Sequence, residues 1–291
     1  MVSIAASAVA LGAWLPAQAF GAAPQTQAPR RPQLRFDGTV PTLPSPAVAT
    51  ATSSNWAGYV VGQPAVGQTT YTSVTGTWRM PRVQCTKATA AAASAVWVGL
   101  GGSTESSPAL EQIGTSSDCS RAAKPDYSAW YEIVPAPPVP IALKVVPGDT
   151  ITTSVNVDGT TVLLQIKNRT RRTSFTTRVD VESPDLSSAE WIAEAPSLCT
   201  STNSCRPVAL ANFGTVSFSR AAAIGSTHPG TISDPVFGAT MVQLVPDAGQ
   251  GQWGNMAGLA PISAAGATPG PLTPDGRAFT VTWQENASAV G

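Results

Sequence analysis

Two glutamates stand in a segment that is otherwise apolar, and they are the first residues that could do chemistry. The segment Ser188–Pro196 reads Ser-Ala-Glu-Trp-Ile-Ala-Glu-Ala-Pro. As a β-strand it would place Glu190, Ile192 and Glu194 on one face. A carboxylate on a covered face needs a polar partner, and such carboxylates often lie at active sites. The alternative is that both glutamates are solvated on an outer face.

A partner for these glutamates must come from another strand. Glu190 and Glu194 would lie about 13 Å apart on one strand, at ~3.3 Å per residue. Paired carboxylates of glycosidases need roughly 5 to 9.5 Å, so the two do not form such a pair. The segment Leu110–Gly114 offers Glu111, which would give a carboxylate pair, and Gln112, which would give an amide donor. These two neighbours face opposite sides of a strand, and the residues alone leave both open.

Other kinds of catalytic chemistry find little support in the sequence. The chain has a single histidine, His228, in a loop-like stretch without a nucleophile motif, so a serine or cysteine triad is not expected. Zinc ligands, a phosphate-binding loop and a dinucleotide fingerprint are all missing. We therefore expect no metal and no cofactor, and hydrolysis by side-chain acids and amides remains.

The elements that would position these residues read as strands throughout. Ile151, Thr153, Val155 and Val157 alternate with polar residues and lead into a hairpin signal at Asp158-Gly159. Many short strands with Gly and Pro punctuation predict an all-β sandwich or barrel. Further strands are expected at residues 55–61, 73–80, 94–100, 127–133, 213–218, 240–245 and 278–283.

The chain divides into three parts on composition. Residues 1–19 resemble an export signal, because an apolar run ends in the cleavage pattern Ala17-Gln18-Ala19. Residues 20–50 are rich in Pro, Ala, Gln and Thr and are expected to be a disordered linker or pro-segment. Residues 51–291 would form one β domain. The prediction is a secreted, extracellular protein.

The cysteines agree with export. Their even number in an exported chain predicts two disulfides. The short spacing of Cys199 and Cys205 suggests a local pair, which leaves Cys85 with Cys119.

Charge and hydropathy limit the kinds of partner that the protein is expected to bind. Charged residues make up 12% of the chain, about half the usual share. The sequence has no basic patch for nucleic acid, and no segment after the signal is long and apolar enough for a membrane span. We expect a monomer that binds neither nucleic acid nor membrane.

An ordered series of short segments resembles the glutamic peptidases of the eqolisin type, the scytalidoglutamic peptidase group. The resemblance covers about residues 53–283, nearly all of the expected mature chain. Its segments are Ser54–Gly58, Trp97–Gly102, Leu110–Gly114, Tyr127–Glu132, Gly148–Asp149, Ala189–Glu194 and Phe213–Phe218. Three positions depart from the fungal pattern: Gly101 and Ser128 stand where that pattern has aspartates, and Val134 stands where it has a tyrosine.

The resemblance implies a fold and a set of site residues. The fold would be a concanavalin-like β-sandwich of two packed, curved antiparallel sheets, with a substrate cleft on the concave face. The family's catalytic glutamine matches Gln112, and its catalytic glutamate is matched to Glu194 rather than Glu190. Aromatic residues of the cleft correspond to Trp97 and Trp130.

These matches predict a secreted acid endopeptidase that acts on polypeptides. Glu194 would take a proton from a bound water, which attacks the peptide carbonyl, while Gln112 donates a hydrogen bond to the oxyanion. Two alternatives remain. One is a lectin-like sandwich that binds carbohydrate through its tryptophans, and the other is a glycoside hydrolase that pairs Glu111 or Glu132 with Glu194.

Overall fold

The protein is almost entirely β-structure. The computed structural model describes residues 48–62, 69–104, 107, 109–201, 204–246 and 265–286, with the side chains of 198–206 left aside. Within that part the helical content is one 3-10 turn, Lys87–Thr89. The strands are β1 Ala49–Ser53, β2 Trp56–Val61, β3 Tyr71–Arg79, β4 Ala95–Gly101, β5 Leu110–Cys119, β6 Pro125–Val134, β7 Val139–Ile141, β8 Thr150–Asp158, β9 Thr161–Asn168, β10 Thr173–Asp180, β11 Ala189–Glu194, β12 Ser197–Ser201, β13 Ser204–Pro207, β14 Thr215–Gly225, β15 Pro229–Gly230, β16 Ala239–Leu244, β17 Gly266–Pro269 and β18 Phe279–Gln284.

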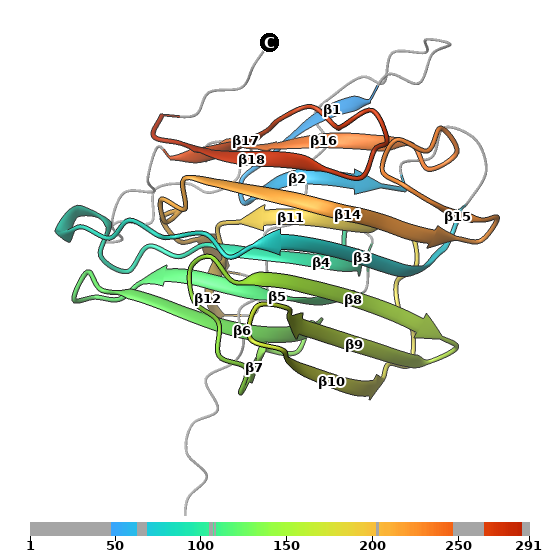
Figure 1. The fold of residues 1–291 in the computed structure, drawn as a ribbon, viewed down its shortest axis with the longest axis horizontal. Coiled ribbons are helices and arrows are strands. Elements are labelled where there is room, and N and C mark those ends of the chain that lie inside the picture. Colours follow the sequence, from blue (N-terminus) through green and yellow to red (C-terminus); the bar gives the residue numbers. More distant parts are fainter. Residues whose placement is uncertain are drawn as a thin grey trace, which may run out of the picture.

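Hydrogen bonding joins sixteen of these strands into one long sheet that folds over on itself. The order is β10-β9-β8-β3-β14-β18-β17-β16-β2-β11-β4-β5-β6-β7, with β1 added in parallel beside β16 and β15 beside β14. Figure 1 shows the result as two stacked layers, with β14, β3, β8, β9 and β10 lying over β2, β11, β4, β5 and β6. The all-β sandwich that the sequence predicts is confirmed.

The core fills the space between the two layers, and tryptophans connect them. Trp191 on β11 donates its indole N–H to the Thr75 carbonyl oxygen on β3 (2.7 Å). Trp78 on β3 donates to Thr115 Oγ1 on β5 (3.1 Å). A buried indole N–H needs an acceptor, so each bond fixes both the ring and the distance between layers.

Burial differs between the two layers in a way that the sequence explains. Every residue of β2, β4 and β11 is buried, since these central strands are covered on both faces. β8 and β9 alternate between buried and half-exposed residues, as period-two patterning predicts for strands with one covered face. Their hairpin turns at Gly159 and Thr160, one residue after the expected position, with Gly159 at a φ of +59°.

One of the two predicted disulfides is present. Cys85 and Cys119 are bonded and link the segment after β3 to the end of β5. Cys199 and Cys205 face each other in the register of the β12–β13 pair, and their side chains lie outside the described residues. Their bond therefore stays a prediction.

The boundary of the folded part lies slightly before the expected one. Strand β1 begins at Ala49, so residues 49 and 50 belong to the sheet rather than to the linker assigned to 20–50. The expected export signal and most of that linker lie outside the described residues. Among the described residues, no helix is long and apolar enough to cross a membrane.

Candidate active site

The sequence-predicted residues gather on one face of the second layer, the face turned away from the first layer. We call it the site face. Its buried apolar residues form a cluster separate from the main core: Trp56, Val60, Ala95, Trp97, Leu110, Trp130, Ile192 and Val242. Strand β11 places Glu190, Ile192 and Glu194 on this face, and it places Trp191 and Ala193 in the main core. The alternation predicted for this strand is confirmed.

The strand register aligns residues of β2, β11, β4, β5 and β6 into rows across the site face. The first row is Val60, Glu190, Gly99, Gln112 and Glu132; the second is Gly58, Ile192, Trp97, Gly114 and Trp130; the third is Trp56, Glu194, Ala95, Ser116 and Ser128. Side chains of residues directly opposite one another point to the same side of a sheet, so each row is a set of neighbours.

The first row brings together an amide and a carboxyl group. Gln112 on β5 and Glu190 on β11 are both opposite Gly99 on β4. Their Cα atoms are therefore two strand spacings apart, roughly 9 to 10 Å. Gly99 has no side chain to fill the space between them, and a Cβ added there would lie 2.9 Å from a Leu110 methyl group and 3.0 Å from the Trp97 ring. Gly99 thus lets Leu110 and Trp97 pack directly over the backbone between Gln112 and Glu190.

Gln112 is oriented by its neighbour on the other side. Its amide Nε2 donates a hydrogen bond to Glu132 Oε2 on β6 (2.5 Å). All polar atoms of Gln112 are buried, as is Glu132, so the bond fixes which way the amide points. Sequence reasoning left the role of Glu132 open. The strand pairing of Leu110–Cys119 with Pro125–Val134 gives it one.

Glu190 lies in an environment that favours the protonated acid. It is completely buried, and neither carboxyl oxygen has a hydrogen-bond partner in the described structure. Burial raises the pKa of Glu190 well above its usual value, and negative charge on Asp185 and Glu111 raises it further. A carboxyl group with a raised pKa accepts and returns a proton at a pH closer to neutrality.

Glu111 faces the opposite side of β5, as expected from the alternation. It pairs with Leu100 on β4, on the side of the main core, and both its carboxyl oxygens are buried without a hydrogen-bond partner. Burial raises the pKa of Glu111 to about 8, and nearby Asp185 adds to the effect. Glu111 and Gln112 therefore lie on opposite faces of β5, and only Gln112 is on the site face.

Glu194 occupies the third row and is held by two donors. Asn55 Nδ2 donates to Glu194 Oε1 (3.2 Å), and the Trp97 indole N–H donates to Glu194 Oε2 (2.7 Å). Glu194 is opposite Ala95 and Ser116, which is four residues along β5 from Gln112. Four residues span about 13 Å along a strand, in addition to two strand spacings across. The register therefore does not bring Gln112 and Glu194 together.

Trp97 lies between these two groups. Its ring edge borders the space above Gly99, while its N–H holds Glu194. It also packs edge-to-face against Trp56 with ring centroids 5.0 Å apart. Glu194 and Asn55 thus fix the tryptophan that forms a wall of the first row. The side-chain contact of Asn55 with Glu194 has no signal in the sequence alone.

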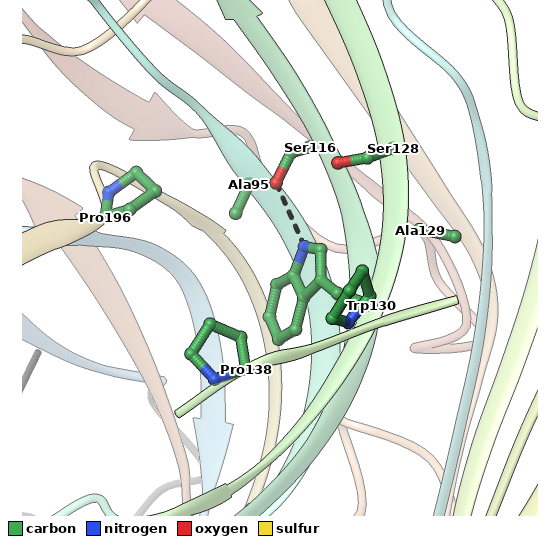
Figure 2. Close-up of a pocket in the computed structure, with 8 residues that line it drawn as sticks. Ala95, Ser116, Ser128, Ala129, Trp130, Pro138 and Pro196 are labelled. Carbon is green, nitrogen blue, oxygen red and sulfur yellow. Dashed lines mark hydrogen bonds between the residues drawn. The ribbon is translucent and has the colours of Figure 1, made fainter. Parts of the chain in front are cut away.

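Trp130 completes the second row on β6, the strand next to the edge strand β7. Its indole N–H donates to Ser116 Oγ (3.0 Å), and only 8% of the residue is exposed. It lines a pocket together with Ala95, Ser116, Ser128, Ala129, Pro138, Pro140 and Pro196 (Figure 2). Trp97 and Trp130 are brought to one face, as the resemblance implies.

The remaining candidates lie elsewhere. His228 bonds Asp234 and Thr227 in the segment around β15, away from the rows of the site face. In the described ranges no group of three or more His, Cys, Asp or Glu side chains could hold a metal ion.

Comparisons with known proteins show which family the chain belongs to. The model of the Peptidase A4 family matches residues 54–252, which is more than half of the chain and includes every row of the site face. The chain belongs to the Peptidase A4 family. Members of this family are peptidases, so the protein is a hydrolase acting on peptide bonds rather than a lectin or a glycosidase.

Solved structures of similar fold support the membership. Scytalido-glutamic peptidase, solved with a peptide-based transition-state analogue, is 21% identical with a TM-score of 0.60, over 79% of this chain and 98% of that chain. SCP-B, of the eqolisin family and solved with the tripeptide Ala-Ile-His, is 21% identical with a TM-score of 0.57 over the same shares. At this identity the likeness concerns the fold. A comparison with curated proteins finds no match.

Proposed function

We propose that this chain is a secreted glutamic endopeptidase that uses Gln112 and Glu190 to hydrolyse peptide bonds at acidic pH. The observation that carries the assignment is the shared register of these two residues on either side of Gly99. This register puts an amide donor and a buried carboxyl group two strand spacings apart on the face of the sheet that also bears the tryptophans. Signal-like residues 1–19 and the Cys85–Cys119 disulfide support export.

The mechanism follows from the two side-chain types. The ionised form of Glu190, which burial makes the minor form at acidic pH, takes a proton from a water molecule between it and Gln112, and the resulting hydroxide attacks the peptide carbonyl carbon. The Gln112 amide donates a hydrogen bond to the developing oxyanion. Protonated Glu190 then gives its proton to the leaving amine as the C–N bond breaks. Gln112 does not titrate, so it remains a donor across the acidic range.

Two further residues have positioning roles. Glu132 holds the Gln112 amide in place, and Glu194 holds the Trp97 ring beside the reacting groups. This differs from the prediction that pairs Gln112 with Glu194, which stays a second assignment for the general base. The two assignments predict opposite outcomes for two single substitutions.

The deciding experiment compares Glu190→Gln with Glu194→Gln on an acid-denatured protein substrate across pH 2 to 7. Removing the general base should lower kcat by roughly 10²- to 10⁴-fold, so Glu190→Gln should be nearly inactive. Glu194→Gln keeps an amide oxygen to accept from Trp97 and should lose about tenfold or less. Gln112→Ala should lose roughly 10²- to 10³-fold in kcat.

Two controls make the result readable. Gln112 and Glu190 are completely buried in the full chain. Every variant is therefore first incubated at pH 3 to 4, and its mass is followed to see whether the proposed pro-segment is removed. Circular dichroism checks that each variant is folded. Activity that survives in Glu190→Gln and disappears in Glu194→Gln would return the base to Glu194. Peptide-bond cleavage by neither variant nor the wild type would refute the proposed activity.

A further inference from the structure

The pocket beside Trp130 has a lining that the catalytic proposal does not use. We call it the Trp130 pocket. Strands β4, β5 and β6 provide its floor, and the segments at β7 and after β11 provide its sides. The lining residues are Ala95, Ser116, Ser128, Ala129, Trp130, Pro138, Pro140 and Pro196. Figure 2 shows the Trp130 ring in the middle of these residues, with Pro138 and Pro196 both to its left in this view.

The pocket lies close to the proposed reacting groups on the same face. Trp130 belongs to the second row, and Ala95, Ser116 and Ser128 belong to the third. The second row is two residues along the strands from the row of Gln112 and Glu190, or about 7 Å. An extended peptide advances by a similar distance over two residues. The pocket therefore lies where the side chain of a residue one to three positions from the cleaved bond would fall.

The walls of the pocket are stiff before any ligand arrives. Trp130 cannot turn freely, because its indole N–H is bonded to Ser116 Oγ and 92% of its surface is covered. Three of the eight lining residues are prolines, whose ring fixes φ and leaves no backbone N–H to satisfy. A preorganised pocket loses little conformational entropy when a side chain enters, so more of the contact energy appears as affinity.

The lining carries no charge. The acid nearest in the strand register is Glu194, opposite Ala95, and it is fully buried with its carboxylate held by Asn55 and Trp97. Ser116 Oγ accepts the Trp130 N–H, which leaves Ser128 as an exposed hydroxyl at the rim. A lysine or aspartate side chain entering this pocket would lose water without gaining a charged partner. An aliphatic or aromatic side chain would gain contact with Trp130 and the prolines.

We propose that the Trp130 pocket is a specificity subsite for one uncharged, apolar side chain of the peptide substrate and that it rejects charged side chains. This inference rests on the proposed function. At the corresponding position of the substrate, Leu, Met or Phe should be preferred over Lys or Asp by about 30-fold or more in kcat/KM. Such discrimination reflects the cost of taking a charged side chain out of water without a charged partner.

The test begins with a mixture of peptides that vary at the three positions on each side of the cleaved bond. One position should show the apolar preference in the wild type. Ser128→Asp places a carboxylate at the rim and should raise cleavage of the Lys peptide at that same position by tenfold or more, while other positions keep their preferences. The matched variant Ser128→Asn, of the same size without charge, should keep the apolar preference. Equal preferences in Ser128→Asp and Ser128→Asn at every position would overturn the proposal.

A binding experiment separates this proposal from the catalytic one. Tripeptides with a central Leu or a central Lys are titrated calorimetrically into Glu190→Gln, which needs no turnover. Tighter binding of the Leu peptide that weakens in Glu190→Gln/Trp130→Ala supports the pocket even if the wild type cleaves nothing. Equal binding of both peptides, or saturable binding of an oligosaccharide control instead, would overturn it even if cleavage is confirmed.

Discussion

Asn168 shows how a single residue can match a modification sequence that the fold does not allow. Asn168-Arg169-Thr170 and Asn286-Ala287-Ser288 both fit the acceptor pattern for N-glycosylation. Asn168 is 1% exposed, and its Nδ2 donates to Asp149 Oδ2 (2.7 Å) and to the Lys144 carbonyl oxygen (3.1 Å). A glycan on that nitrogen would break both bonds. Asn286 is exposed.

We therefore expect folded protein secreted from a eukaryotic host to carry a glycan at Asn286 and none at Asn168. Peptide mapping by mass spectrometry measures the occupancy of both sites. Asn286→Gln should remove all N-linked mass from the secreted protein. A glycan on Asn168 in protein that retains its native circular dichroism would contradict the burial of that side chain.

The candidate site could be predicted from the sequence at the level of faces, and only partly at the level of pairs. Period-two alternation correctly assigns Glu190 and Glu194 to one face and separates Gln112 from Glu111. Which glutamate meets Gln112 depends on the register between β11, β4 and β5. The pairing of β11 with β4 joins residues about 90 positions apart, and nothing in the local sequence records that register. The contacts of Asn55 and Glu132 were missed for the same reason.

Among the strands, those with one covered face can be predicted from the sequence better than those buried on both faces. The strands β8 and β9 are visible from alternation, because each has one covered face. The central strands β2, β4 and β11 read only as apolar runs, because both of their faces are buried. The sheet order places β11 between β2 and β4, which are far from it in the chain, so it does not follow from hairpin signals.

The Cys85–Cys119 disulfide stabilises the elements that carry the site. It closes a loop with a sequence separation of 34 residues that contains β4 and almost all of β5. In the chain-entropy model a loop of this length is worth about 4 kcal/mol, because the crosslink restricts the unfolded chain. The double variant Cys85→Ala/Cys119→Ala should lose about that much free energy of unfolding, measured by urea denaturation at pH 5.

The control for this prediction is the pair expected at Cys199 and Cys205, which would close a much shorter loop. Its removal should cost clearly less, since the entropy term grows with loop length. Equal losses from the two double variants would mean that loop closure is not what makes the first disulfide stabilising.

For the whole molecule, the buried acids set the pH range in which the two layers stay together. Glu111 has a pKa raised to about 8, and Asp118 has a pKa raised to about 6, in both cases mainly by burial. The folded state therefore favours the protonated form of both acids. The stability from Glu111 is complete below its ordinary pKa of 4.5 and is lost as the pH rises through about 8. The stability from Asp118 is complete below its ordinary pKa of 3.8 and is lost as the pH rises through about 6.

The magnitudes are large compared with the stability of a typical domain. At 1.36 kcal/mol per pKa unit, ionisation of Glu111 lowers the free energy of unfolding by on the order of 5 kcal/mol, and ionisation of Asp118 lowers it by on the order of 3 kcal/mol. Glu190 acts in the same direction. Asp149 acts in the opposite direction. Burial alone would raise its pKa, but the hydrogen bonds from Asn168 and Arg171 lower it, so its contribution is lost as the pH falls rather than as it rises.

We therefore expect the free energy of unfolding to fall by several kcal/mol between pH 4 and pH 8, as measured by urea denaturation. In Glu111→Gln the fall should be smaller, because the neutral amide cannot ionise inside the protein. The matched control Glu182→Gln changes an exposed acid and should keep the full slope of the wild type. Parallel curves for the wild type and Glu111→Gln would show that Glu111 does not ionise in the folded protein. A peptidase stabilised in this way is most stable at the acidic pH proposed for its activity and becomes less stable toward neutrality.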